Sequence, residues 1–309
     1  MQTGVFLGLS AALLWGVADF CARGAARAAG TFRTLLFVEI IAIPALLLTG
    51  PFGLIILRGE QWPMILAAAA VGLIILGGAG LLYRAFAIGK LALVSPIASA
   101  FAAVTALLAI ATGERLAGLT LLGVILTLMG VVLASSSGEP KSAGEMKSTG
   151  ESKSGALDSP VRKLAPGLLE AIGAMLTFGV GYWLLDFIVP TLGGVTTAFI
   201  AKVGDLVALG VIALLLAWRA PHKPQPELRL SQPFWLWVIP VALLDTAANI
   251  AYNIGIATAL TSIVVTLSSL FSAVTVLLAW VVLRERLALW QWVGVLTILL
   301  GVLLVNLRA

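Results

Sequence analysis

This chain has 309 residues, of which 61% are hydrophobic and 11% are charged, with a mean hydropathy of +1.10. Soluble domains carry roughly 45–50% apolar and about 25% charged residues, so this composition excludes a soluble globular protein. The formal net charge of +5 comes from the polar segments between apolar runs, so it does not indicate nucleic-acid binding.

Apolar runs recur along the whole chain, each of about 20 residues, the length that crosses a hydrocarbon core of roughly 30 Å. Because lipid offers no hydrogen-bond partners to the backbone, Leu-, Ala-, Gly- and Val-rich runs of this length predict transmembrane helices. The sequence therefore predicts an all-α membrane protein with ten such helices, near 4–22, 33–50, 63–83, 91–112, 117–135, 165–187, 195–217, 233–253, 260–283 and 287–307.

The two halves of the chain contain the same motifs. AVTALLA at 103–109 precedes ERLA at 114–117, and AVTVLLA at 273–279 precedes ERLA at 285–288. Tyr83 matches Tyr252, and Trp15-Gly16 matches Phe178-Gly179. With five predicted spans in each copy, the second copy must enter the membrane from the opposite face. This predicts two inverted five-helix repeats, as in many secondary transporters.

A polar segment separates the halves, in which GEPKSA at 138–143 is echoed by GEMKST and then GESKSG. Its mixed charges and lack of aromatic residues cannot support a packed core. We predict a first repeat over 1–135, a flexible cytoplasmic linker over 136–164 and a second repeat over 165–309. The first apolar run has no basic stretch before it and no clear cleavage site, so it is interpreted as the first helix rather than a signal peptide.

The basic residues predict the orientation in the membrane. Of the 19 Lys and Arg residues, fifteen fall on one side of the predicted spans, three (Arg58, Arg115 and Arg308) on the other, and Lys202 inside a span. By the positive-inside rule, the basic side is cytoplasmic and both termini are periplasmic.

The first helix contains Trp-Gly. Gly-Glu-Arg-Leu at 113–116 is followed by Gly123 and Gly130, and the second Glu-Arg-Leu at 285–287 is followed by Gly294 and Gly301. In these three features the chain resembles the EamA-type repeats of the drug/metabolite transporter superfamily. Length and an aromatic-rich first half look most like the bacterial amino-acid exporters of the YddG type. The resemblance implies a ten-helix basket with a central cavity, in the bacterial cytoplasmic (inner) membrane. Phe178 stands where the first copy has Trp15, so the two half-sites are expected to differ.

Polar side chains inside the spans are the main site candidates, because they are costly in lipid and usually face a cavity or a partner. Four of them share one stripe of the eighth predicted helix: Asp245, Asn249, Tyr252 and Asn253. We interpret this stripe as a polar wall that contacts substrate, with a helix-packing seam as the alternative.

Three further intramembrane charges are candidates for charge or coupling roles. Lys202 and Asp205 lie three residues apart and can neutralise each other, while Glu39 on the equivalent helix of the first half aligns loosely with Asp205. A purely internal ion pair and a direct role with the charged ends of the substrate, or with a proton, both stay open. The pairs at 114–115 and 285–286 are expected to be structural, at helix starts.

Aromatic residues within the repeats are the other candidate lining: Trp15, Tyr83, Phe178 and Tyr182. They suit an aromatic or bulky apolar substrate side chain, with ordinary core packing as the alternative.

Several chemistries are excluded. One cysteine and one histidine allow neither a disulfide framework nor a Cys/His metal cluster. Gly89-Lys90 lacks the flanking residues of a phosphate-binding loop, so direct ATP use is not expected. An intramembrane aspartyl protease with Asp205 and Asp245 as its dyad is disfavoured, because it leaves the duplication unexplained and Lys202 stands where a glycine is expected.

The sequence therefore predicts a secondary transporter, not an enzyme, that exports aromatic and other apolar amino acids by alternating access. We expect it to need no cofactor or metal. Its expected partners are the amino-acid substrate and the lipid bilayer, with no obligate protein partner and no nucleic acid. The alternatives are another organic solute, such as a drug-like cation, a sugar or a nucleotide-derived metabolite, and a non-transporting membrane scaffold.

Overall fold

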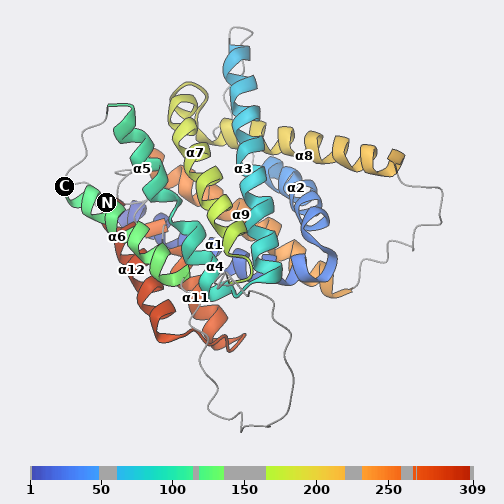
Figure 1. Ribbon diagram of the computed structural model, residues 1–309. Coiled ribbons are helices and arrows are strands. Elements are labelled where there is room, and N and C mark those ends of the chain that lie inside the picture. Colours follow the sequence, from blue (N-terminus) through green and yellow to red (C-terminus); the bar gives the residue numbers. More distant parts are fainter. Residues whose placement is uncertain are drawn as a thin grey trace, which may run out of the picture.

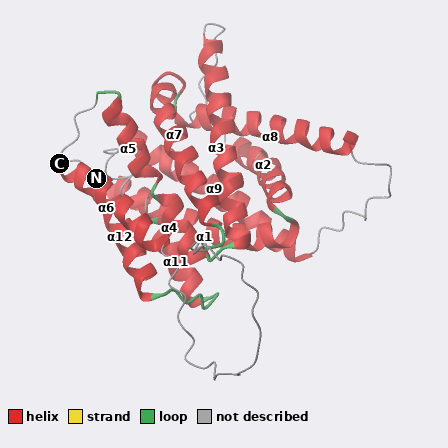
Figure 2. Ribbon diagram, viewed as in Figure 1, coloured by secondary structure: helices red, strands yellow, loops and turns green. Residues whose placement is uncertain are grey.

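The computed structural model describes residues 2–48, 61–113, 118–135, 165–219, 232–258, 267–268 and 270–306. Within these ranges the regular structure is helical and there is no strand (Figure 2). The predicted linker at 136–164 lies outside them. In chain order the helices are α1 (Gln2–Ala29), α2 (Thr31–Leu48), α3 (Trp62–Ile88), α4 (Leu91–Ser99), α5 (Phe101–Ala111), α6 (Gly118–Ser135), α7 (Leu168–Leu192), α8 (Gly194–Arg219), α9 (Gln232–Thr258), α11 (Phe271–Val281) and α12 (Leu289–Asn306) (Figure 1).

The outer surface of these helices is apolar, as the composition requires. Five of them are long and apolar enough to cross a membrane, within α1, α3, α7, α8 and α9, and shorter apolar helices lie at 91–105, 121–134, 271–281 and 289–304. Large side chains stay exposed, with Trp218 at 84% and Leu214 at 72%, on the part of α8 that extends away from the other helices in Figure 1. Such a surface is unfavourable in water and matches the chemistry of lipid.

The fourth span, predicted as one helix over 91–112, is divided into two helices. The chain forms α4, then a break at Ala100, then α5, and Pro96 inside α4 removes one backbone donor just before the break. Leu270, immediately before α11, has nearly the same backbone angles (φ −70°, ψ −2°) as Ala100 (φ −66°, ψ 0°). The following residues, Phe101 and Phe271, each lie two residues before a copy of the duplicated motif, so the copies share this backbone geometry.

Packing between the halves is reciprocal. Thr275 of α11 donates a hydrogen bond to the carbonyl of Gly16 in α1 (3.2 Å), and Thr105 of α5 donates one to the carbonyl of Gly179 in α7 (3.0 Å). Side chains at either glycine would collide with a valine of the opposing helix, so the close approach requires glycine at both. Each copy thus packs its first helix on the fourth span of the other, the pattern of two repeats related by a two-fold axis.

Candidate functional site

Lys202 is the centre of a charged cluster that joins three helices. Its Nζ lies 2.9 Å from Glu39 Oε1 on α2 and 3.4 Å from Asp245 Oδ2 on α9. The side chain of Glu39 is 4% exposed, whereas those of Lys202 and Asp245 are 20% and 25% exposed. One ammonium group is therefore shared by two carboxylates, a tight partner and a looser, more accessible one.

Lys202 and Asp205 do not form a direct ion pair in the described part of the chain. Among the described residues, the ion pairs of Lys202 are with Glu39 and Asp245. Asp205 is buried and faces α3, where a Cβ on Gly72 would lie 3.2 Å from its Oδ1, and this oxygen has no hydrogen-bond partner in the described part of the chain. Spacing on one helix places two side chains near each other, but the neighbouring helices decided which way each one points.

The predicted alignment of Glu39 with Asp205 also needs correction. Gly30 and Gly193 precede α2 and α8 with φ of 83° and 76°, and the threonine four residues after each donates to its carbonyl, at 2.9 and 2.7 Å. This shared start sets the register of the two helices. Glu39 and Lys202 each come nine residues after that glycine, so they occupy equivalent positions.

Trp15 connects the charged cluster to a group of rings. Its indole Nε1 donates a hydrogen bond to Asp245 Oδ1 (3.2 Å), so Asp245 lies between Trp15 and Lys202. The indole ring is 5.6 Å from the ring of Tyr252 and 6.3 Å from that of Phe271, between centroids. The structure thus brings three predicted residues together with Phe271, which the sequence reasoning missed although it lies two residues before the second copy of the duplicated motif.

The remaining members of the α9 stripe contribute less to these contacts. Asn249 donates its side-chain amide to the carbonyl of Asp245 one turn earlier (2.8 Å), which uses one of its donors within the helix. The side chain of Asn253 lies outside the described residues.

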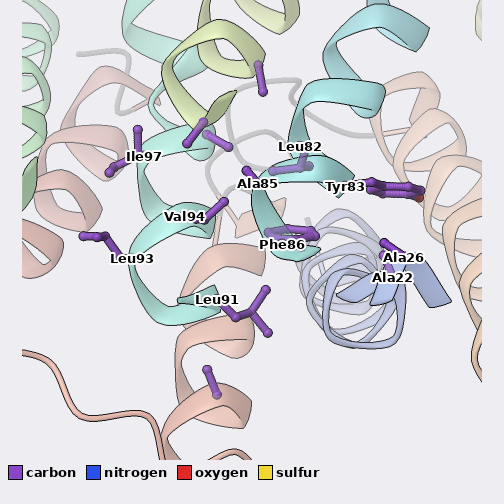
Figure 3. Packing of buried hydrophobic residues seen from close by; sticks show 14 of the residues in the cluster. Ala22, Ala26, Leu82, Tyr83, Ala85, Phe86, Leu91, Leu93, Val94 and Ile97 are labelled. Atoms are coloured by element: carbon purple, nitrogen blue, oxygen red, sulfur yellow. The ribbon is translucent and has the colours of Figure 1, made fainter. Parts of the chain in front are cut away.

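The predicted aromatic residues of the third and sixth spans lie in two further settings. Phe178 and Tyr182 of α7 contact Phe101, whose ring stacks on that of Tyr182 at 4.9 Å. Tyr83 instead is buried and stacks on Phe86, in the apolar cluster of α3 with Ala22 and Ala26 of α1 (Figure 3). Tyr83 therefore lies in a packed core, and its substrate contact stays a prediction.

Surface hollows lie away from all of these residues. One of about 340 Å³ is lined by Leu128, Met129, Val132 and Leu133 of α6, and another of about 320 Å³ by Leu81, Arg84, Leu169 and Glu170. The described residues also hold no group of three His, Cys, Asp or Glu side chains that could bind a metal ion. The central cavity stays a prediction, which the partial exposure of Lys202 and Asp245 supports.

Comparisons with known proteins bear on the whole chain. A model of the EamA-like transporter family matches residues 2–136 and 165–307. No curated protein matches the sequence. One similar solved structure, described only as the crystal structure of a protein, is 17% identical, covers 98% of both chains and has a TM-score of 0.60, a similarity of fold alone.

Proposed function

This chain belongs to the EamA-like transporter family, within the drug/metabolite transporter superfamily, and from that premise we propose that it exports amino acids with aromatic or other apolar side chains. Transport proceeds by alternating access through a cavity between the two repeats, which we place at 1–135 and 165–309 on either side of a cytoplasmic linker at 136–164. The protein resides in the bacterial inner membrane with periplasmic termini. The YddG-type exporters are the subgroup it resembles most.

The observation that carries this proposal is the shared ammonium group of Lys202. An amino acid presents one carboxylate and one ammonium group, and Lys202 and Asp245 offer the complementary pair at 3.4 Å. Insertion of the substrate between them replaces one ion pair by two and leaves no charge unpaired, which matters because an unpaired charge is costly away from water. Glu39, held at 2.9 Å, keeps Lys202 in place during the exchange.

Aromatic rings next to this pair supply the apolar part of the site. The rings of Tyr252 and Phe271 lie 5.6 and 6.3 Å from the ring of Trp15, whose indole N–H donates to Asp245. A bulky apolar side chain gains from contact with such rings, whereas a charged side chain would have to give up its hydration to lie among them. This composition supports selectivity for Phe, Trp, Met or Leu over Asp, Glu or Lys.

An organic cation is the second candidate substrate, and one observation favours it. Two carboxylates, Glu39 and Asp245, share a single lysine, and a cation would bind Asp245 beside the Trp15 ring. Unlike an amino acid, such a substrate would have no use for Lys202.

The experiment that separates the two candidates is solute exchange in proteoliposomes. We expect labelled Phe to exchange, and unlabelled Trp, Met and Leu to compete better than Asp, Lys or tetraphenylphosphonium. Lys202→Gln should abolish Phe exchange, because the substrate carboxylate loses its partner, while the control Glu170→Gln, which breaks a peripheral ion pair with Arg84, should exchange normally. Retained binding of the organic cation in Lys202→Gln, with no amino-acid exchange in the wild type, would favour the second candidate.

A further inference from the structure

Glu285 connects three segments that are distant in sequence. Its Oε1 lies 2.7 Å from Arg23 Nη1 of α1, and its Oε2 accepts a hydrogen bond from the backbone N–H of Ala92 (2.9 Å). The side chains of Arg23 and Glu285 are only 10% and 8% exposed. The carboxylate was expected to stabilise the start of its own helix, α12, but it instead caps α4, whose first N–H groups have no partner within that helix.

A second contact holds the same loop to the same corner. Lys90, which precedes α4, donates its ammonium group to the carbonyl of Arg286 at 2.8 Å. Arg284, just before Glu285, has φ of 52°, a left-handed conformation that is unfavourable for a residue with a side chain. Gly113, at the equivalent position of the first copy, has φ of 99°. Both positions thus have positive φ, and Arg284 holds it against a backbone preference that the contacts of its loop must offset.

The positions that match Arg23 and Glu285 in the other copies of the motifs carry two acidic residues. Arg23 and Asp186 each follow the matched glycine, Gly16 or Gly179, by seven residues, and Glu285 corresponds to Glu114 in the two ERLA motifs. Two acidic residues cannot pair as Arg23 and Glu285 do, since like charges repel. The side chains of Asp186 and Glu114 lie outside the described residues.

We propose that Glu285 is a gating residue, which closes the basic end of the transport pathway by clipping the loop between α11 and α12 to α1 and α4. Helices α4 and α11 belong to the fourth spans of the two copies. Release of Glu285 therefore frees α1, α4 and α11 to separate. Because the matching positions carry two acidic residues, the clip is not duplicated in the sequence, and Glu285 biases the molecule towards closure at the basic end.

Cys21 provides a reporter for this gate. It is the one cysteine of the chain, its thiol is buried, and it lies two residues before Arg23 on α1. A membrane-impermeant thiol reagent is applied to each face of membrane vesicles without any substrate. We expect slow labelling of the wild type and about tenfold faster labelling of Glu285→Gln from the face that carries Arg23 and Lys90, because the isosteric amide loses the buried ion pair.

Matched variants make the test specific. Glu170→Gln also breaks a carboxylate–arginine pair, with Arg84, but that arginine is 67% exposed and the pair holds only α3 to α7, so it should label as slowly as the wild type. Arg23→Gln, and Arg23→Gln with Glu285→Gln, should label as fast as Glu285→Gln alone, because all three lack the same interaction. If Glu285→Gln does not fold, Arg23→Gln carries the test.

Wild-type labelling in the folded gate variants would overturn the proposal, as would an equal increase in Glu170→Gln. The inference rests on the proposed function only in assuming a transport pathway. Since labelling needs no substrate, absence of amino-acid exchange would contradict the proposed substrate and leave the gate to be judged by Cys21 alone.

Discussion

Glu39 and Lys202 stand at equivalent positions of the two repeats and pair with each other, with 2.9 Å between Oε1 and Nζ. Equivalent residues meet in this way only close to the axis that relates the copies. A perfectly symmetric pair would place like charges together, so the two copies diverged to opposite signs where they meet. The added carboxylate of Asp245, which corresponds to Leu76 by the match of Tyr83 to Tyr252, makes the cluster asymmetric.

Removal of the lysine should therefore destabilise the fold. Lys202→Met leaves Glu39 buried without its partner, and we expect a loss of about 3–5 kcal/mol, the usual result of breaking a buried pair. Adding Glu39→Gln should recover much of this loss, because the buried charge is then gone, but should not recover amino-acid exchange. Thermal unfolding in detergent measures both, and equal stability of the single and double variants would contradict the expectation.

Trp15 should have two roles, to limit the size of the substrate and to hold Asp245 by a hydrogen bond. Trp15→Ala enlarges the site and should change the ranking of large against small amino acids more than it lowers transport of all of them. Trp15→Phe keeps a ring but loses the hydrogen bond to Asp245, so the ranking should persist with affinity weaker by roughly 0.5–1.5 kcal/mol. Competition assays in proteoliposomes compare the two, and a uniform loss in Trp15→Ala would assign the residue to packing or gating.

The α9 stripe can be tested one residue at a time. Tyr252→Leu removes a ring that lies 5.6 Å from Trp15, and Asn249→Leu removes an amide one turn after Asp245. Both variants should lose amino-acid transport yet remain extractable as folded protein, because α9 keeps its apolar packing. Transport at the wild-type level in both would identify the stripe as a helix-packing seam.

Orientation in the membrane follows from the basic residues, several of which the structure brings to one end. Arg23 pairs with Glu285, Lys90 bonds to Arg286, and Arg27 Nε donates to the carbonyl of Ala87 at 3.0 Å. This end should be cytoplasmic. A reporter after Ala309 should then be periplasmic, and a protease site placed within 140–158 should be cut only from the cytoplasmic face. The reverse pattern would show that the charge rule fails for this chain.

The family and the helical architecture were predictable from the sequence because they depend on local properties. Hydropathy located the spans, since a helix in lipid must be apolar over its whole length, and the matched motifs revealed the duplication. The polar candidates stood out for the same reason, because few charges occur within these spans. Asp245, Tyr252 and Trp15, chosen on these grounds, meet in the structure.

Only the tertiary structure decided the partners of these groups. Lys202 is three residues from Asp205, yet it pairs across helices with Glu39 and Asp245. Glu285 precedes α12, yet it caps α4, nearly two hundred residues earlier in the chain. A side chain on a helix can adopt several orientations of similar free energy, and the helices packed against it decide which of these finds a partner. Sequence spacing thus identifies which charges must be satisfied, and the packing of α1, α2, α4, α8 and α9 determines what satisfies them.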